Sequence, residues 1–224
     1  MNRRIGSAVL VAAVAGGLAA VYGGWATITV ENLPDNLVAG TPYNLTFSVR
    51  QHGVNLLGDL TPYVTLQSGK HEATARAVPT NRAGYYTATI NVPQSGEWSA
   101  DIQSSFGKSH LQLMPITALD AGARRTVSFS QPERGQRLFV AKGCVACHEN
   151  ARVAGSGIYQ VGPALTDKRF EPNYLRKFLA DPSIKPPTTK ERMPDLNLSD
   201  AEIAALVAFL NGETPARAAA SGGR

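Results

Sequence analysis

The hydrophobic pattern of the chain changes twice along its length. Residues 5–24 carry no charge and are dominated by Ala, Val, Leu and Gly. Over residues 27–115, apolar and polar positions alternate with period two in short runs, which is typical of half-buried strands. Over residues 130–212, apolar positions recur after three or four residues, as on one face of a helix. The pattern predicts a multi-domain chain with an N-terminal apolar segment, an all-β region and an all-α region.

The alternating region predicts an antiparallel β-sandwich over residues 27–115. The runs that we expect to be strands are 43–50, 63–66, 86–92, 98–102 and 110–113. Turn signals separate them at 52–53, 68–69, 83–84 and 94–96. Residues 116–129 show no sustained period, and we expect a linker there.

The helical region carries strong start and stop signals. Ser130 or Gln131 can cap a first helix, with Pro132 in its first turn and Glu133 available for a capping box. A second helix is expected over 172–180. Ser199 and Glu202 form another capping-box pattern before the apolar helix that ends near Asn211-Gly212. The Ala/Gly/Arg-rich residues 213–224 are expected to be disordered.

The sequence Cys144-Val145-Ala146-Cys147-His148 reads C-x-x-C-H, the attachment signature for a c-type haem. Cys144 and Cys147 are the only cysteines, so a zinc site with a second Cys or His pair has no support. The helical lead-in also disfavours a thioredoxin-like redox pair. A simple disulfide stays open only if haem is never attached.

Two further positions are candidate haem-site residues. Met193 is the only Met in the helical region and is the candidate distal iron ligand, because a thioether gives a soft sixth ligand. The alternative is that Met193 only packs against the haem edge and leaves the iron open or ligated by a lysine. A carbonyl near Gly162-Pro163 is positioned in the sequence to accept the Nδ1–H of His148, although the same residues also fit an ordinary turn.

Two stretches of the chain resemble known families. Residues 131–212 are similar to a class I mono-haem cytochrome c domain, through Gly135, the Gly143–His148 run, Gly162–Leu165 and Met193–Asp200. The resemblance implies thioether bonds at Cys144 and Cys147, axial ligation by His148 and Met193, and a contact between the first and last helices. The candidates for that contact are Gly135, Phe139 and Phe209.

The β region resembles the immunoglobulin-like domains of bacterial envelope proteins called FixH-like or YtkA-like. The motifs that carry this resemblance are residues 39–42, 84–88 and 93–98. It implies a sandwich but no activity. A copper site from His52, His71, His110 and Met114 is conceivable, but no two of these His residues share a local metal spacing.

Residues 1–26 fit either a transmembrane anchor or a cleaved signal peptide. Arg3 and Arg4 precede about 20 uncharged residues, the length that crosses a bilayer. A small-x-small end at Gly24-Trp25-Ala26 fits a cleavage site instead. Both interpretations place the rest of the chain outside the cytoplasm, in the periplasm or at the outer face of a bacterial inner membrane, where haem c is attached.

These features together predict a one-electron carrier, not an enzyme. Two strong axial ligands leave no iron position free for a substrate. The expected partners are a redox protein donor and acceptor, and the carrier is either free or a tethered subunit of a larger respiratory or photosynthetic complex. A haem sensor or enzyme with an open iron site is the alternative. The net charge of +5 includes no tract of basic and aromatic residues, so nucleic-acid binding has little support.

Overall fold

A computed structural model describes residues 24–123, 127–184 and 193–212. Residues 1–23 and 213–224 lie outside the described residues, so the anchor or signal peptide and the disordered tail stay predictions. Within the three described ranges, no helix is long and apolar enough to cross a membrane. Ala26, the last residue of the predicted N-terminal segment, is the first residue of a strand.

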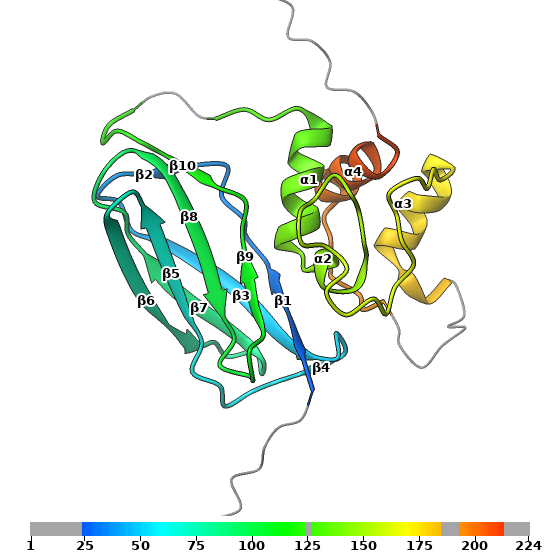
Figure 1. Cartoon of the computed structure of the whole chain (residues 1–224), viewed down its shortest axis with the longest axis horizontal. Coiled ribbons are helices and arrows are strands. Elements are labelled where there is room, and N and C mark those ends of the chain that lie inside the picture. The colour runs from blue at the N-terminus through cyan, green and yellow to red at the C-terminus, as the bar shows by residue number, and fades with distance from the viewer. Residues whose placement is uncertain (1–23, 124–126, 185–192, 213–224) are drawn as a thin grey trace, which may run out of the picture.

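The first part of the chain is built from strands that follow one continuous hydrogen-bonded path. The strands in the described residues are β1 (Ala26–Val30), β2 (Leu37–Val38), β3 (Tyr43–Gln51), β4 (Asn55–Leu56), β5 (Tyr63–Ser68), β6 (His71–Pro79), β7 (Tyr85–Ile90), β8 (Gly96–Gln103), β9 (His110–Gln112) and β10 (Ile116–Leu119). The path runs β1-β3-β7-β6-β5-β8-β10-β2, with β4 paired to β3 and β9 paired to β8 (Figure 1). All pairs are antiparallel except β10 with β2.

Strands on both sides of β6 contribute to one apolar core. Phe47 of β3 and Trp98 and Ile102 of β8 are fully buried, and all three belong to the same buried cluster. Each of the five predicted strand runs overlaps an observed strand, namely β3, β5, β7, β8 or β9. The all-β class is therefore confirmed, whereas the immunoglobulin-like assignment stays a prediction.

The predicted linker begins later than expected, because residues 116–119 form strand β10. Ile116 pairs with Trp98, and Ala118 pairs with both Gly96 and Leu37. Four residues are too few to show a sustained period, although Ile116 and Ala118 are buried in alternation with two partly exposed neighbours.

The second part of the chain is helical in its described residues. It contains α1 (Gln131–Ala141), α2 (Cys144–Cys147), α3 (Pro172–Ala180), the 3-10 turn η1 (Pro182–Ile184) and α4 (Asp200–Leu210). Both predicted capping boxes are confirmed: the backbone N–H of Ser130 donates to Glu133 at 2.8 Å, and that of Ser199 donates to Glu202 at 2.9 Å.

Helices α1 and α4 cross in close contact, as the resemblance implied. A Cβ atom at Gly135 would lie 2.0 Å from the carbonyl oxygen of Ala205, so only glycine permits this approach. The rings of Phe139 and Phe209 pack beside it, with centroids 5.6 Å apart. This crossing fixes the end of α1, from which the cysteine motif continues.

The helical domain packs against the edge of the sandwich formed by β1 (Figure 1). All five residues of β1 are buried, including Thr27 and Thr29. An exposed edge strand presents unpaired backbone N–H and C=O groups that can pair with the strand of another chain. Covering the edge strand prevents such pairing. The two domains therefore meet along β1.

Candidate haem site

A cavity of about 560 Å³ lies where the helical domain meets the sandwich. The six residues predicted from the sequence all line it: Cys144, Cys147, His148, Gly162, Pro163 and Met193. Most of the other lining residues are apolar, and those on α1, α3, α4 and the segment before α4 include Phe139, Leu175, Phe178, Leu179, Leu196, Leu198, Leu206 and Leu210. The size and the apolar lining fit a cofactor pocket.

The short helix α2 presents the two cysteines. Gly143, in the left-handed conformation with φ of 77°, lets the chain turn from α1 into α2. Both thiols are free and partly buried. Burial raises the pKa of Cys144 to about 12, with Cys147 adding to the effect, and burial raises the pKa of Cys147 to about 11. Reactive redox thiols have a lowered pKa, so thiol redox chemistry is a poor fit here.

His148 directly follows α2, and its ring is held from one side. Its Nδ1 atom lies 2.9 Å from the carbonyl oxygen of Pro163. Because a carbonyl only accepts, Nδ1 carries the hydrogen and Nε2 is left with its lone pair. Burial lowers the pKa of His148, partly opposed by this hydrogen bond, and so favours the neutral imidazole that ligates metals.

Gly162 packs directly on the His148 ring. A Cβ atom at this position would lie 2.5 Å from Cε1 and 2.6 Å from Nδ1 of His148. Any side chain at 162 would displace the ring or break its hydrogen bond. The Gly-Pro pair therefore positions the imidazole through both steric fit and a backbone acceptor.

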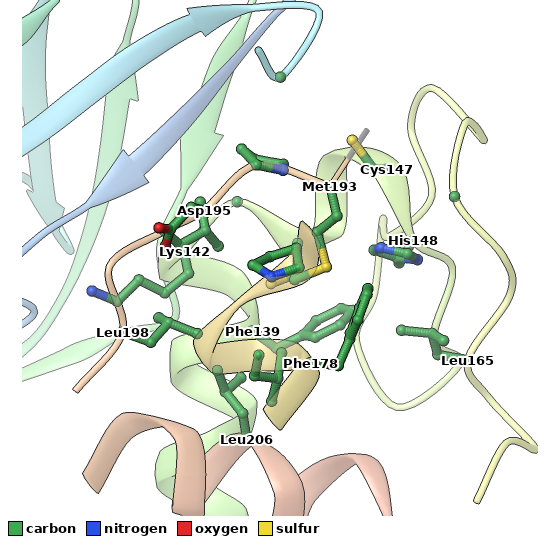
Figure 2. Close-up of a pocket in the computed structure, with 18 of the residues that line it drawn as sticks. Phe139, Lys142, Cys147, His148, Leu165, Phe178, Met193, Asp195, Leu198 and Leu206 are labelled. Carbon is green, nitrogen blue, oxygen red and sulfur yellow. The ribbon is translucent and has the colours of Figure 1, made fainter. Parts of the chain in front are cut away.

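Met193 approaches the cavity from the segment that leads into α4. Figure 2 shows its side chain pointing into the cavity beside the His148 ring, with Cys147 above both in this view. Met193 is partly buried and packs against the apolar core. A thioether and a neutral imidazole facing one cavity are a common pair of axial haem ligands.

The sequence did not indicate that residues of the sandwich line the cavity. Thr27 and Thr29 of β1 and the His52-Gly53 turn after β3 line it. Alternation within the sandwich gives no signal for this role, because the contact depends on the second domain.

The four residues considered for copper do not form a metal site in the described structure. His110 Nδ1 instead lies 3.0 Å from Asp101. Among residues 24–123, 127–184 and 193–212, no group of three or more His, Cys, Asp or Glu side chains could hold a metal ion. Copper therefore gains no support from the geometry.

The comparisons with known proteins point to the helical domain. Residues 130–210 match the sequence model of the family described as cytochrome C oxidase, cbb3-type, subunit III. No curated protein matches the chain. Among solved structures, a putative glycoside hydrolase from Bacteroides vulgatus ATCC 8482 is similar at 19% identity and a TM-score of 0.32. That similarity covers 43% of this chain and 19% of the hydrolase chain, and it carries no argument about function.

The cavity fits haem in its size, its apolar walls and its pair of free cysteines beside an oriented histidine. The family match covers this same part of the chain. The match therefore supports a cytochrome c domain over residues 130–210, and such a domain implies covalently bound haem c as the cofactor.

Proposed function

We propose that the protein is an extracytoplasmic electron carrier in which Cys144 and Cys147 hold haem c, with His148 and Met193 as its axial ligands. The observation that carries this proposal is that all four side chains line one cavity. Addition of each thiol S–H across a vinyl group forms a thioether without a leaving group. When bound, haem c supplies one-electron Fe(II)/Fe(III) chemistry.

The protein's own contribution is to hold the ligands and to exclude water. The Pro163 carbonyl fixes the His148 tautomer, and Gly162 leaves room for the ring. The apolar residues around them give the dry surroundings that help set a reduction potential. Two protein ligands leave no iron position for a substrate, which supports a carrier over an enzyme.

Redox proteins are the expected donor and acceptor. Residues 1–26 would tether the carrier to the membrane or direct its export, so that the haem domain works on the periplasmic side. The family whose model matches residues 130–210 is named for an oxidase subunit, which is compatible with a role within a larger respiratory complex. The sandwich, which we expect to be immunoglobulin-like, would then be the extra module that places the haem domain.

Replacing Met193 tests the proposed ligation directly. Met193→Ala is expected to retain covalent haem but lose the weak long-wavelength absorption of Met-ligated ferric haem. The reduced variant should bind CO, and its reduction potential should fall because the soft ligand is gone. Optical spectra, the mass of the holoprotein and a redox titration measure these changes.

Met114→Ala provides a matched control, because Met114 packs in the sandwich and is not among the cavity residues. This variant should leave the spectrum and the CO response unchanged. If wild-type protein already binds CO readily and Met193→Ala has the same spectrum, Met193 is not the ligand. The open-iron sensor or enzyme would then be the better explanation.

A further inference from the structure

The wall of the haem cavity next to the cysteine motif is partly made by the sandwich. Thr27 and Thr29 of β1 and the His52-Gly53 turn line the same cavity as Cys144 and Cys147. Strand β1 is at one end of the sheet path, and its five residues are nevertheless buried. The helical domain lies against this strand (Figure 1), and β9 of the sandwich contacts it as well.

The residue before the first cysteine lies directly on the backbone of β1. A Cβ atom at Gly143 would lie 2.4 Å from the carbonyl oxygen of Ile28. The positive φ of Gly143 already favours glycine, and the approach of β1 gives a second, independent reason for it. The cysteine motif therefore begins where the two domains touch.

Lys142 joins the domains with a buried charge. Its side chain is 2% exposed, and its Nζ atom lies 2.7 Å from Glu202 Oε1 at the start of α4. The same ammonium donates to the carbonyl of Glu31 at 3.2 Å, just after β1. The Lys142 carbonyl in turn accepts from the hydroxyl of Thr29 at 3.4 Å. Because a buried charge is tolerated only when it is well partnered, these contacts favour one relative position of the two domains.

An aromatic contact fixes the boundary at the other end of β1, where Trp25 directly precedes the strand. Trp25 stacks on Tyr159 with ring centroids 4.1 Å apart, and its other neighbour is the edge of the His52 ring at 5.4 Å. The backbone N–H of Tyr159 donates to the carbonyl of Ala146 in α2 at 2.9 Å. The stack thus connects the start of the sandwich to the helix that carries both cysteines.

We propose that the sandwich is a fixed cover of the haem cavity. Lys142 and Trp25 act as positioning residues, which hold β1 and the His52-Gly53 turn against the cavity. The cover excludes water from the side of the cavity where the cysteine motif begins, and dry surroundings disfavour the more highly charged ferric state. It therefore raises the reduction potential and directs a redox partner to the uncovered part of the cavity. The effect on potential rests on the proposed electron-carrier function; the position of the cover does not.

The test uses the full-length holoprotein and the variants Trp25→Ala and Lys142→Met. Loosening the cover should lower the reduction potential and make oxidation of the reduced haem by ferricyanide several-fold faster, because greater access and a lower potential both favour that reaction. Hydrogen exchange of the backbone amides in β1 should also become several-fold faster, and this readout does not depend on the haem. Trp25 lies at the rim of the boundary, so Trp25→Ala keeps the test available if Lys142→Met fails to fold.

His71→Ala is the matched control, because His71 is an exposed residue of β6, a strand that contributes nothing to the cavity lining, and it should change none of the three readouts. Faster exchange in β1 with an unchanged potential and an unchanged rate of oxidation by ferricyanide would overturn the cover, since the sandwich would then only touch the helical domain. Unchanged exchange in both variants would overturn the roles of Lys142 and Trp25. Absence of covalent haem from the wild type would instead contradict the proposed function, while exchange in β1 would still report on the boundary.

Discussion

At the scale of single residues, the haem site depends on places where a side chain is missing. Gly162 lies against the His148 ring, Gly143 lies on the backbone of β1, and Gly135 allows α1 to meet α4. Each glycine permits an approach that a Cβ atom would block. The C-x-x-C-H motif indicates His148 as a candidate ligand, whereas the placement of its ring depends on the neighbouring Gly162.

Gly162→Ala should therefore disturb the histidine without removing it. The added Cβ, placed 2.5 Å from Cε1 of His148, must shift the ring or lengthen the 2.9 Å hydrogen bond to Pro163. We expect an altered haem spectrum, a shifted reduction potential and a loss of about 1–3 kcal/mol in the free energy of unfolding, as overpacking usually costs. Redox titration and denaturant unfolding measure these effects.

Gly58→Ala is the appropriate comparison, because a Cβ atom at position 58 would meet nothing within 4 Å. It should leave both the spectrum and the unfolding free energy close to wild type. If Gly162→Ala behaved in the same way as Gly58→Ala, the close packing of residue 162 on His148 would have no functional consequence.

At the scale of elements, the helices begin at carboxylates whose ionisation the fold favours. Hydrogen bonds from Ser130 lower the pKa of Glu133, and the backbone N–H groups of Asn173 and Tyr174 lower the pKa of Glu171. For Glu202, burial alone would raise the pKa, but hydrogen bonds from Lys142 and Ser199 outweigh it and the net shift is downward. Each of the helices α1, α3 and α4 thus has a carboxylate with a lowered pKa at its N-terminus.

The helical domain should consequently lose stability in acid. A carboxylate whose pKa is lowered by folding stabilises the fold above its ordinary pKa, and this contribution is lost as the pH falls through the folded-state value. We expect the free energy of unfolding to decrease below a pH of about 4.5, the ordinary value for Glu. Urea unfolding at a series of pH values provides the measurement.

Glu171→Gln should reduce this acid sensitivity, because one of the three carboxylates no longer titrates. Glu72→Gln removes an exposed carboxylate from β6, outside the helices, and serves as its control. An identical pH dependence in wild type and Glu171→Gln would show that the cap of α3 does not contribute to the acid response.

The elements that could be predicted from the sequence are those whose signals are local. The capping boxes at Ser130 and Ser199 lie within four residues, and so both helix starts were predicted correctly. Strand β6 escaped prediction because its inward positions are alanines, which have little preference for strands. Strand β1 shows no alternation in its burial, because both the helical domain and β9 contact it.

The same distinction between local and distant signals applies to the site. The C-x-x-C-H run and the Gly162-Pro163 pair lie within 20 residues of each other and could be predicted. The contact of Thr29 with Lys142 joins residues 113 positions apart, and no local sequence pattern predicts such a contact. The contribution of the sandwich to the cavity therefore became visible only in the folded chain.

At the scale of the whole molecule, the boundary along β1 makes the two domains energetically dependent on each other. Separating them would expose the buried β1 and would leave the ammonium of Lys142 without the Glu31 carbonyl. Exposed apolar surface and lost partners of a buried charge both oppose separation. The two domains should therefore unfold at similar denaturant concentrations.

We accordingly expect a single cooperative unfolding transition in denaturant. Haem absorbance follows the helical domain, and hydrogen exchange of β8, whose Trp98 is fully buried, follows the sandwich. Coincident midpoints are expected in the wild type. In Lys142→Met the midpoints should separate, because the charged contact across the boundary is lost. Two well-separated midpoints in the wild type would mean that the domains are only adjacent, and the sandwich could not then act as a fixed wall of the haem cavity.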